Sequence, residues 1–375
     1  MRKKLERFGE ILNPLVKTSY SSDDVEILLQ DVRGRVPILD TEEREKLNQS
    51  GVHYSEMLPL EYRPTDKYMD IYYESLDRLS SETANAIELL SEKLISKKGK
   101  NIVIVSLARA GTPIGILVKR YIKFKWGYDV PHYSISIIRG KGIDVAAMNY
   151  IVDKHGVDGI QFLDGWVGKG AINTVLSNAC KDLEDKDVKF KGIDSELAVL
   201  SDPASVTDLY GTRQDFLIPS ACLNATVSGL ISRTVKLQSM TDDEYHGAIY
   251  YSEYENEDKS IEFIDKVCTY FSKEVVNHFS PSIAEQDENF KGIDEVKYIG
   301  FVYGVEDINK IKPGVGETTR VLLRRLPDRV LIRKGADEKY LKHIKRLCEE
   351  KNVPIEYFDL KKYNVCGIIK DVADL

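Results

Sequence analysis

Apolar runs alternate with segments of helical length between residues 101 and 201, and this alternation constrains the fold more than any other feature. The apolar runs are short and continuous, at Asn101–Ala108, Val130–Ile138, Ile160–Trp166 and Leu197–Ser201. Helical segments separate them, at 113–124, 143–155 and 169–182. Continuously apolar strands joined by helices form parallel sheets covered on both faces. The sequence therefore predicts an α/β protein built on a parallel sheet with helices on both faces.

The flanking segments predict a helical N-terminal section and a second domain. Apolar residues recur near a period of 3.6 from Asp66 to Lys97, which predicts one long helix. Three further helices and one solvated arm are predicted, with the helices at 23–29, 220–232 and 259–279 and the arm at 241–258. The last segment has its own alternation of helices and strands. We therefore expect domains at 1–294 and 295–375, the second a small α/β domain.

Cysteine and histidine spacing excludes several site classes. The five cysteines are scattered without a CxxC pair, and the histidines form neither HExxH nor HxxxH. This pattern argues against a disulfide framework and against a zinc site, so no protein-bound metal is predicted. The N-terminus is charged and no apolar run follows it. The sequence thus predicts a cytoplasmic protein without a membrane anchor.

The third apolar run ends in a loop suited to a phosphate. The segment IQFLDGWVGKG places Asp164 and Gly165 at the end of the strand and Gly168, Lys169 and Gly170 before a helix. Glycines let backbone N–H groups converge on an anion at a helix N-terminus, and Lys169 adds a positive charge. The carboxylate of Asp164 can accept hydrogen bonds from sugar hydroxyls. No GxxxxGK[ST] spacing occurs, which disfavours a nucleotide triphosphatase.

Two neighbouring strand ends carry similar loops. The first strand is followed by Arg109, Ala110 and Gly111, where a guanidinium and backbone N–H groups suit a pyrophosphate. The second ends in Arg139-Gly140-Lys141-Gly142, a flexible basic loop able to cover a leaving anion. Each loop alone could be an ordinary turn. Because the carboxyl ends of parallel strands share one edge, the three loops together predict an anion site.

These motifs carry a family resemblance. The strand–Asp–loop–Gly-Lys-Gly pattern, preceded by Ala-Arg-Ala-Gly-Thr-Pro, resembles the type I phosphoribosyltransferases over roughly residues 100–235. More closely, most of the chain resembles bacterial phosphoribosyltransferase-like proteins of tellurite-resistance and stress-response gene clusters. Some of those relatives are labelled cysteine protease. The resemblance implies a sheet of phosphoribosyltransferase type and a transferase that makes a nucleoside-like product in a stress response.

The resemblance also implies roles for individual residues. Phosphoribosyl pyrophosphate would be the ligand, with Mg²⁺ held mainly by the substrate's own oxygens. Catalysis would rest on Asp164, Arg109 and Lys141. Pyrophosphate would be bound by Arg109, Ala110, Gly111, Arg139 and Lys141, and the phosphoribosyl group by Asp164, Gly165, Gly168, Lys169 and Gly170. Two departures weaken transfer relative to binding: Gly165 replaces a second acid, and Lys169 replaces a hydroxyl.

The polar segment after the fourth strand is where an acceptor would lie. Its candidate contacts are Arg213, Asp215, Asn224, Ser228 and Arg233, for which helix capping and subunit packing are equally good interpretations. Cys222 would be the nucleophile if the chain were instead a cysteine-dependent hydrolase. No sequence feature pairs it with a particular base, although His155 and His246 are present.

The C-terminal segment is strongly basic. Between Lys310 and Arg346 twelve basic residues stand against four acidic ones, while the whole chain carries a net charge of -7. Residues 312–320 resemble the Pelota-type RNA-binding domain, in which a glycine-rich helix start clamps a kinked RNA backbone. The RNA contacts implied are Lys312, Gly314, Gly316, Glu317, Thr318, Arg320 and Arg324. A solvated face or a contact between subunits is the alternative interpretation.

Three hypotheses therefore stay open at this point. The first is a Mg²⁺-dependent phosphoribosyltransferase. The second is an RNA-binding protein whose α/β domain senses a phosphoribosyl ligand, and the third is a hydrolase that uses Cys222. The acceptor, the RNA target and the formation of a homo-oligomer are not fixed by the sequence.

Overall fold

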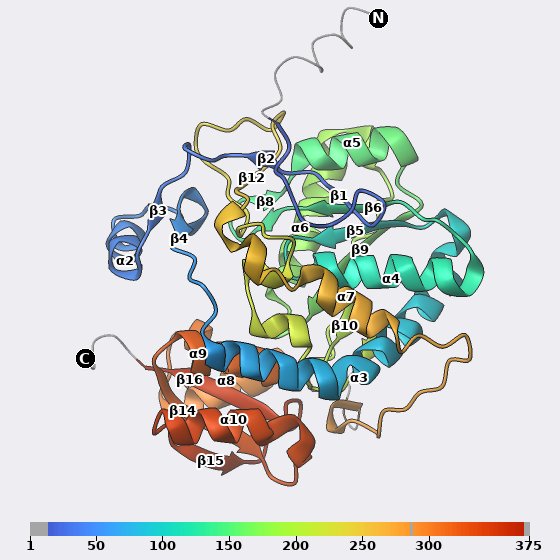
Figure 1. Cartoon of the computed structure of the whole chain (residues 1–375). Helices are drawn as coiled ribbons and strands as arrows, with labels where there is room; N and C mark the ends of the chain where they lie inside the picture. Colours follow the sequence, from blue (N-terminus) through green and yellow to red (C-terminus); the bar gives the residue numbers. More distant parts are fainter. Residues whose placement is uncertain (1–13, 286, 288, 371–375) are drawn as a thin grey trace, which may run out of the picture.

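A six-stranded parallel sheet forms the centre of the larger domain (Figure 1). The computed structural model describes residues 14–370 apart from 286 and 288. The strand order is β1-β6-β5-β9-β10-β11, and each neighbouring pair is parallel. The strands span Glu26–Ile27 (β1), Val103–Leu107 (β5), His132–Ile135 (β6), Ile160–Trp166 (β9), Ala198–Ser201 (β10) and Tyr210–Thr212 (β11). The predicted parallel sheet is thus confirmed.

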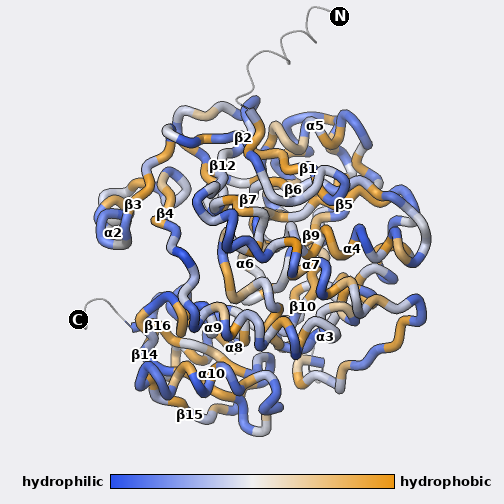
Figure 2. Tube along the Cα trace, viewed as in Figure 1, coloured by the Kyte–Doolittle hydropathy of each residue, from blue (hydrophilic) through white to orange (hydrophobic). Residues whose placement is uncertain are grey.

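Helices cover both faces of this sheet. On one face, α5 (Val145–His155) and α6 (Ala171–Lys186) pack on the side chains of Val105 and Phe162. On the other, α3 (Asp66–Lys98), α4 (Gly111–Trp126) and α7 (Ser260–Cys268) pack on those of Ile104 and Leu163. Adjacent residues of each strand point to opposite faces, so both faces need apolar side chains, which explains the continuous apolar runs. Figure 2 shows hydrophobic residues along these central strands and hydrophilic ones on outlying helices.

The smaller domain is a four-stranded sheet with helices on both sides. Its strand order is β13-β16-β14-β15, and only β14 and β15 run parallel. Along β14, Val330 and Ile332 face α9 and α10, whereas Leu331 faces α8. The elements are α8 (Gly292–Tyr303), β13 (Ile311–Pro313), α9 (Val315–Arg324), β14 (Pro327–Arg333), α10 (Glu338–Glu350), β15 (Ile355–Phe358) and β16 (Val365–Ile369).

Helix α3 belongs to the core of both domains. It lies between the large sheet and the C-terminal domain, where it runs beside α9 and α10 (Figure 1). The hydroxyl of Tyr68 donates to the carbonyl of Leu323, and Lys339 forms an ion pair with Glu82 at 2.9 Å. The apolar cores of the two domains are continuous through this helix. The long helix predicted from periodicity is confirmed, and it also joins the domains.

Several predicted elements are wrong. Residues 23–29 contain the short strand β1 instead of a helix, and 220–232 contain only the 3-10 turns Pro219–Cys222 (η5) and Ala225–Val227 (η6). The predicted helix at 259–279 ends at Cys268. The middle of the predicted solvated arm, residues 245–249, is buried, because β12 (Gly247–Ala248) pairs with β2 (Gln30–Asp31), while both ends of the arm are exposed. Small strands β3 (Ile38–Leu39) and β4 (Leu58–Pro59), with helix α2 (Thr41–Gln49), form a lobe beside the sheet.

A buried carboxylate fixes α9 to the larger domain. Asp215 accepts hydrogen bonds from the backbone N–H of Val315, at the first turn of α9, and of Asn364, both at 2.8 Å. Gly314 precedes the helix with φ +86°, a conformation that favours glycine, and lies against the same carboxylate. Asp215 therefore caps a helix of one domain from a loop of the other.

Removing this carboxylate should destabilise the whole chain. In Asp215→Ala two buried N–H groups lose their acceptor, and each unpaired group costs about 1–3 kcal/mol. We expect the free energy of unfolding, measured by urea denaturation, to fall by roughly 2–5 kcal/mol. The matched control is Asp208→Ala, which removes an exposed carboxylate and should change it by less than about 0.5 kcal/mol. Equal effects of the two substitutions would contradict the capping role.

Candidate functional site

A cavity lies where the carboxyl ends of the large sheet meet the start of α9. Its volume is about 260 Å³. The larger domain contributes loop residues after β5, β7 (Ile137–Ile138) and β9, and the smaller domain contributes residues around β13 and α9. The predicted site residues that line it are Ala110, Arg139, Asp164, Gly168, Lys169, Gly170, Lys312 and Glu317. The structure thus brings the predicted anion loops and the predicted RNA motif to one cleft.

Asp164 is the half-buried acid of this cavity. Its Oδ1 accepts one hydrogen bond, from the backbone N–H of Gly165 at 2.7 Å. Burial raises the pKa of Asp164 to about 7, and that hydrogen bond offsets the effect only in part. Gly111 packs directly against it, since a Cβ there would lie 2.6 Å from the carbonyl oxygen of Leu163. Asp164 therefore takes up a proton at a higher pH than an exposed carboxyl does.

Lys169 is held by the smaller domain. Its Nζ donates to the carbonyl oxygens of Ile308 at 2.7 Å and Ile311 at 3.0 Å. Burial lowers the pKa of Lys169, while the nearby carboxylate of Glu317 raises it. Gly168 allows this approach, because a Cβ there would lie 2.5 Å from Oε1 of Glu317. The lysine and glycines of the loop therefore contact the C-terminal domain closely.

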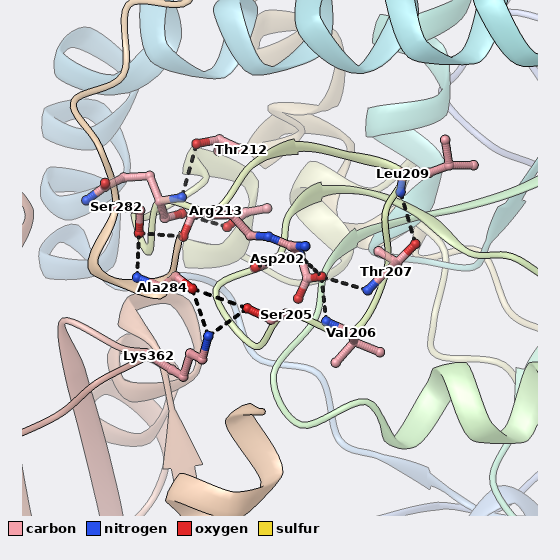
Figure 3. Close-up of polar contacts among 12 residues, drawn as sticks. Asp202, Ser205, Val206, Thr207, Leu209, Thr212, Arg213, Ser282, Ala284 and Lys362 are labelled. Carbon is pink, nitrogen blue, oxygen red and sulfur yellow. Dashed lines mark hydrogen bonds and ion pairs between the residues drawn. The ribbon is translucent and has the colours of Figure 1, made fainter. Parts of the chain in front are cut away.

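The remaining predicted residues of the second loop and the acceptor segment lie elsewhere. Lys141 forms an ion pair with Glu56 at 3.6 Å and is not among the residues lining the cavity. Arg213 is buried in an ion pair with Asp202, next to the buried Lys362 (Figure 3). Lys362 donates to Ser205 Oγ at 2.9 Å and to backbone carbonyls, including that of Ala284 at 2.7 Å. This network packs the two domains together.

Sequence reasoning missed seven lining residues, namely Trp166, Val167, Ala171, Ile172, Asn173, Leu197 and Asn309. Trp166 and Val167 come from the end of β9, and Asn309 comes from the smaller domain. The side chain of Asn309 accepts a hydrogen bond from Arg139 Nη1 at 3.4 Å. Trp166 and Val167 could have been found from their place inside the predicted loop. Asn309 could not, since its position depends on how the domains dock.

The thiol of Cys222 is closed off from solvent. It is fully buried at the end of η5, and its Sγ lies 3.7 Å from Ser75 Oγ on α3. Burial raises the pKa of Cys222 to about 11, although the Ser75 hydrogen bond and the charges of Arg324 and Arg320 lower it. Within residues 14–370 no imidazole is hydrogen-bonded to this thiol. His155 contacts Tyr133 and His246 contacts Ser136, each at 2.8 Å.

Arginines from both domains gather beside Cys222. Arg324 donates to the carbonyl of Cys222 at 2.9 Å and to Asn224 Oδ1, and Arg320 donates to the same Oδ1 at 3.3 Å. Ser228 donates to the backbone carbonyl of Asn224 at 2.8 Å. Burial, together with the neighbouring charges of Arg324 and Arg109, lowers the pKa of Arg320 to about 9. The predicted RNA contacts Arg320 and Arg324 therefore face the larger domain.

Two negative findings concern the described part of the chain. Among its His, Cys, Asp and Glu side chains, no group of three or more could hold a metal ion. None of its helices has the length and apolar character needed to cross a bilayer. Binding of Mg²⁺ through a substrate remains a prediction.

Comparison with known proteins gives two family matches. Residues 18–268 match a family described as Tellurite-like stress resistance cysteine protease StiP, and residues 290–371 match the PELOTA RNA binding domain. The chain is also 35% identical over 348 residues to the Cysteine protease StiP of Acinetobacter baylyi, covering 88% of each chain. The chain belongs to the StiP family. No solved structure matches it.

Membership of the StiP family corrects the predicted activity. The expected likeness to stress-resistance proteins with a Pelota-type domain is confirmed, but the family and the relative are named for a cysteine protease, so the prediction of a phosphoribosyltransferase is wrong. The physical reason is that loops at strand ends are not specific to one reaction. The ammonium of Lys169 already donates to two backbone carbonyls, which leaves one N–H donor for a ribose phosphate.

The raised pKa of Asp164 predicts a pH-dependent stability. The stabilisation contributed by its proton is fully present below the unfolded pKa of about 4 and is lost as pH rises through about 7. In Asp164→Asn the side chain stays neutral at every pH. We therefore expect the unfolding free energy of this variant, relative to wild type, to rise by up to about 4 kcal/mol between pH 4 and 7 in urea denaturation.

The control for this measurement is Asp158→Asn, which replaces an exposed carboxyl near the start of β9. The difference in unfolding free energy between this variant and the wild type should not change between pH 4 and 7. If the difference in unfolding free energy between Asp164→Asn and the wild type is also constant with pH, the raised pKa of Asp164 is contradicted.

Proposed function

We propose that this protein is a cysteine-dependent hydrolase that cleaves peptide bonds, with Cys222 as its nucleophile. The observation that carries the proposal is the position of the Cys222 thiol beside the guanidinium groups of Arg320 and Arg324, whose charges favour a thiolate. The cysteine-protease description of the family and of its Acinetobacter relative supports the reaction class.

Two other cysteines within residues 18–268 are poorer nucleophiles. Cys180 packs in the apolar core under α6, where burial raises its pKa to about 12. Cys268 is half-buried at the end of α7, and a helix C-terminus disfavours a negative charge. Its cationic neighbour Arg120 already pairs with Asp24 at 2.6 Å and Asp265 at 2.8 Å. Cys222 is therefore the preferred candidate.

The reaction requires the closed thiol to open. With a pKa of about 11 and no contact with solvent, Cys222 is almost entirely protonated in this conformation. Loosening of α3 at Ser75 would expose the thiol and leave the arginine charges beside it. The thiolate would then attack the amide carbonyl and form a thioester, the amine would leave with a proton, and water would release the acid. This conformation is thus the resting state of the proposed enzyme.

Loss of the thiol should abolish peptidase activity. Cys222→Ser keeps the size of the side chain but removes its nucleophilic sulfur, so cleavage of a fluorescent casein substrate should fall at least about 100-fold. The control variant is Cys180→Ser, which should keep the wild-type rate. A wild-type protein that cleaves no protein substrate, or a fully active Cys222→Ser, would rule out this proposal.

A second candidate function is RNA binding, which the match of residues 290–371 to an RNA-binding domain favours. Lys312 lines the cleft between the domains and makes no ion pair within the described residues. Phosphate contacts release counterions, so affinity for single-stranded RNA should drop steeply between 50 and 200 mM salt. We expect Lys312→Ala to weaken binding severalfold and to reduce this salt dependence, as measured by fluorescence anisotropy. A salt-independent affinity would contradict a phosphate-based interaction.

A further inference from the structure

Four arginines from the two domains lie close together without a carboxylate partner. Arg109 follows β5, Arg233 follows the η6 turn, and Arg320 and Arg324 lie on α9. Among the residues that the structure describes, none of the four makes an ion pair within 4.0 Å. Arg329 of the smaller domain differs, since it pairs with Asp328 at 2.7 Å and with Glu356 at 2.6 Å.

The few hydrogen bonds of these arginines go to neutral acceptors. Arg109 donates to the carbonyl of Ile231 at 3.1 Å, and Arg233 donates to the carbonyls of Tyr54 at 2.6 Å and Met57 at 2.8 Å. Arg320 and Arg324 share the single side-chain oxygen of Asn224. The buried Nε of Arg233 has no partner at all. A guanidinium has five N–H donors, so most donors of the cluster are available to a ligand.

The four charges also act on one another. Burial lowers the pKa of Arg320, and the charges of Arg324 and Arg109 add to this effect. Burial also lowers the pKa of Arg233, and the charges of Arg44 and Arg109 contribute there. Two acids oppose this from beyond ion-pair distance, Glu61 and Glu317, each of which raises the pKa of Arg320. Like charges held together at partial burial cost stability unless an anion joins them. A cluster of this kind is typical of an oxyanion-binding site.

We infer that Arg109, Arg233, Arg320 and Arg324 form one phosphate-binding centre, shared by the two domains, which takes the backbone of a single-stranded RNA. This inference rests on the RNA-binding function proposed above and extends it to the larger domain. The α9 pair lies within the span that matches an RNA-binding domain. Four cations suit successive phosphates better than one carboxylate of a peptide, which would neutralise a quarter of the charge.

Aromatic rings at the edge of the cluster fit the same ligand. The guanidinium of Arg233 lies 5.5 Å from the ring centre of Tyr54, and Tyr68 lies beside Arg324. Both tyrosines are half-buried, so part of each ring faces outward. Bases of a single strand stack on such rings while arginines hold the phosphates. RNA held there would lie against the Cys222 loop, because Arg324 contacts the carbonyl of that residue.

The test compares Arg109→Met, in the larger domain, with the control Arg329→Met, a paired arginine of the RNA-binding domain. Affinity for a fluorescent ten-nucleotide single-stranded RNA should fall roughly tenfold in Arg109→Met, with a salt slope smaller by about one. The control should bind like the wild type. The melting temperature of Arg109→Met should stay close to that of the wild type, because relief of repulsion offsets the lost hydrogen bond.

Three outcomes would overturn the inference. If Arg109→Met binds RNA as tightly as the wild type does, the site is confined to the C-terminal domain and the proposed RNA-binding function is retained. Absence of RNA binding by the wild-type protein would remove both. The wild-type protein could also fail to bind the RNA but be stabilised by inorganic phosphate or bind an oligoglutamate peptide. That result would identify a free anion or an acidic peptide as the ligand instead.

Discussion

The carboxylate of Asp215 is the interaction on which the arrangement of the molecule depends. It lies in the loop after the last strand of the large sheet, and it accepts hydrogen bonds from the N–H of Val315, the first residue of α9, and from the N–H of Asn364. Burial raises the pKa of Asp215 to about 7, and the two backbone hydrogen bonds lower it. This one side chain therefore sets the position of α9 over the strand ends, and through α9 the position of Arg320, Arg324 and Glu317.

Both proposed functions involve residues at the contact between α9 and the larger domain. Cys222 belongs to the larger domain and lies next to α9. Arg324 of the smaller domain donates a hydrogen bond to its carbonyl, and the charges of Arg324 and Arg320 lower the pKa of its thiol. Loosening of α3 at Ser75, which the proposed hydrolysis requires, would expose the thiol and leave Arg320 and Arg324 beside it.

The sequence predicts the sheet and the long helix well because local patterns determine them. Continuous apolar runs give the strands, and a 3.6 period gives α3. It fails where long-range hydrogen bonds decide the structure. Residues 241–258 look polar, but His246 N–H is bound by Asp144, and the carbonyl of Tyr245 accepts from Gln30 at 2.7 Å. Residues 220–232 are not helical, since Gly229 and Leu230 have positive φ.

The number of basic residues in the C-terminal segment likewise does not show which of them could contact a ligand. Some of the basic residues between Lys310 and Arg346 are paired, two of them with acids of α3: Arg346 with Glu74 at 3.1 Å and Lys339 with Glu82 at 2.9 Å. Such pairs contribute little to the attraction of a ligand. Arg320 and Arg324 differ, because they lie towards the larger domain and donate to the neutral side chain of Asn224. A charge count identifies the basic segment, but only the docked structure shows which of its charges face the other domain.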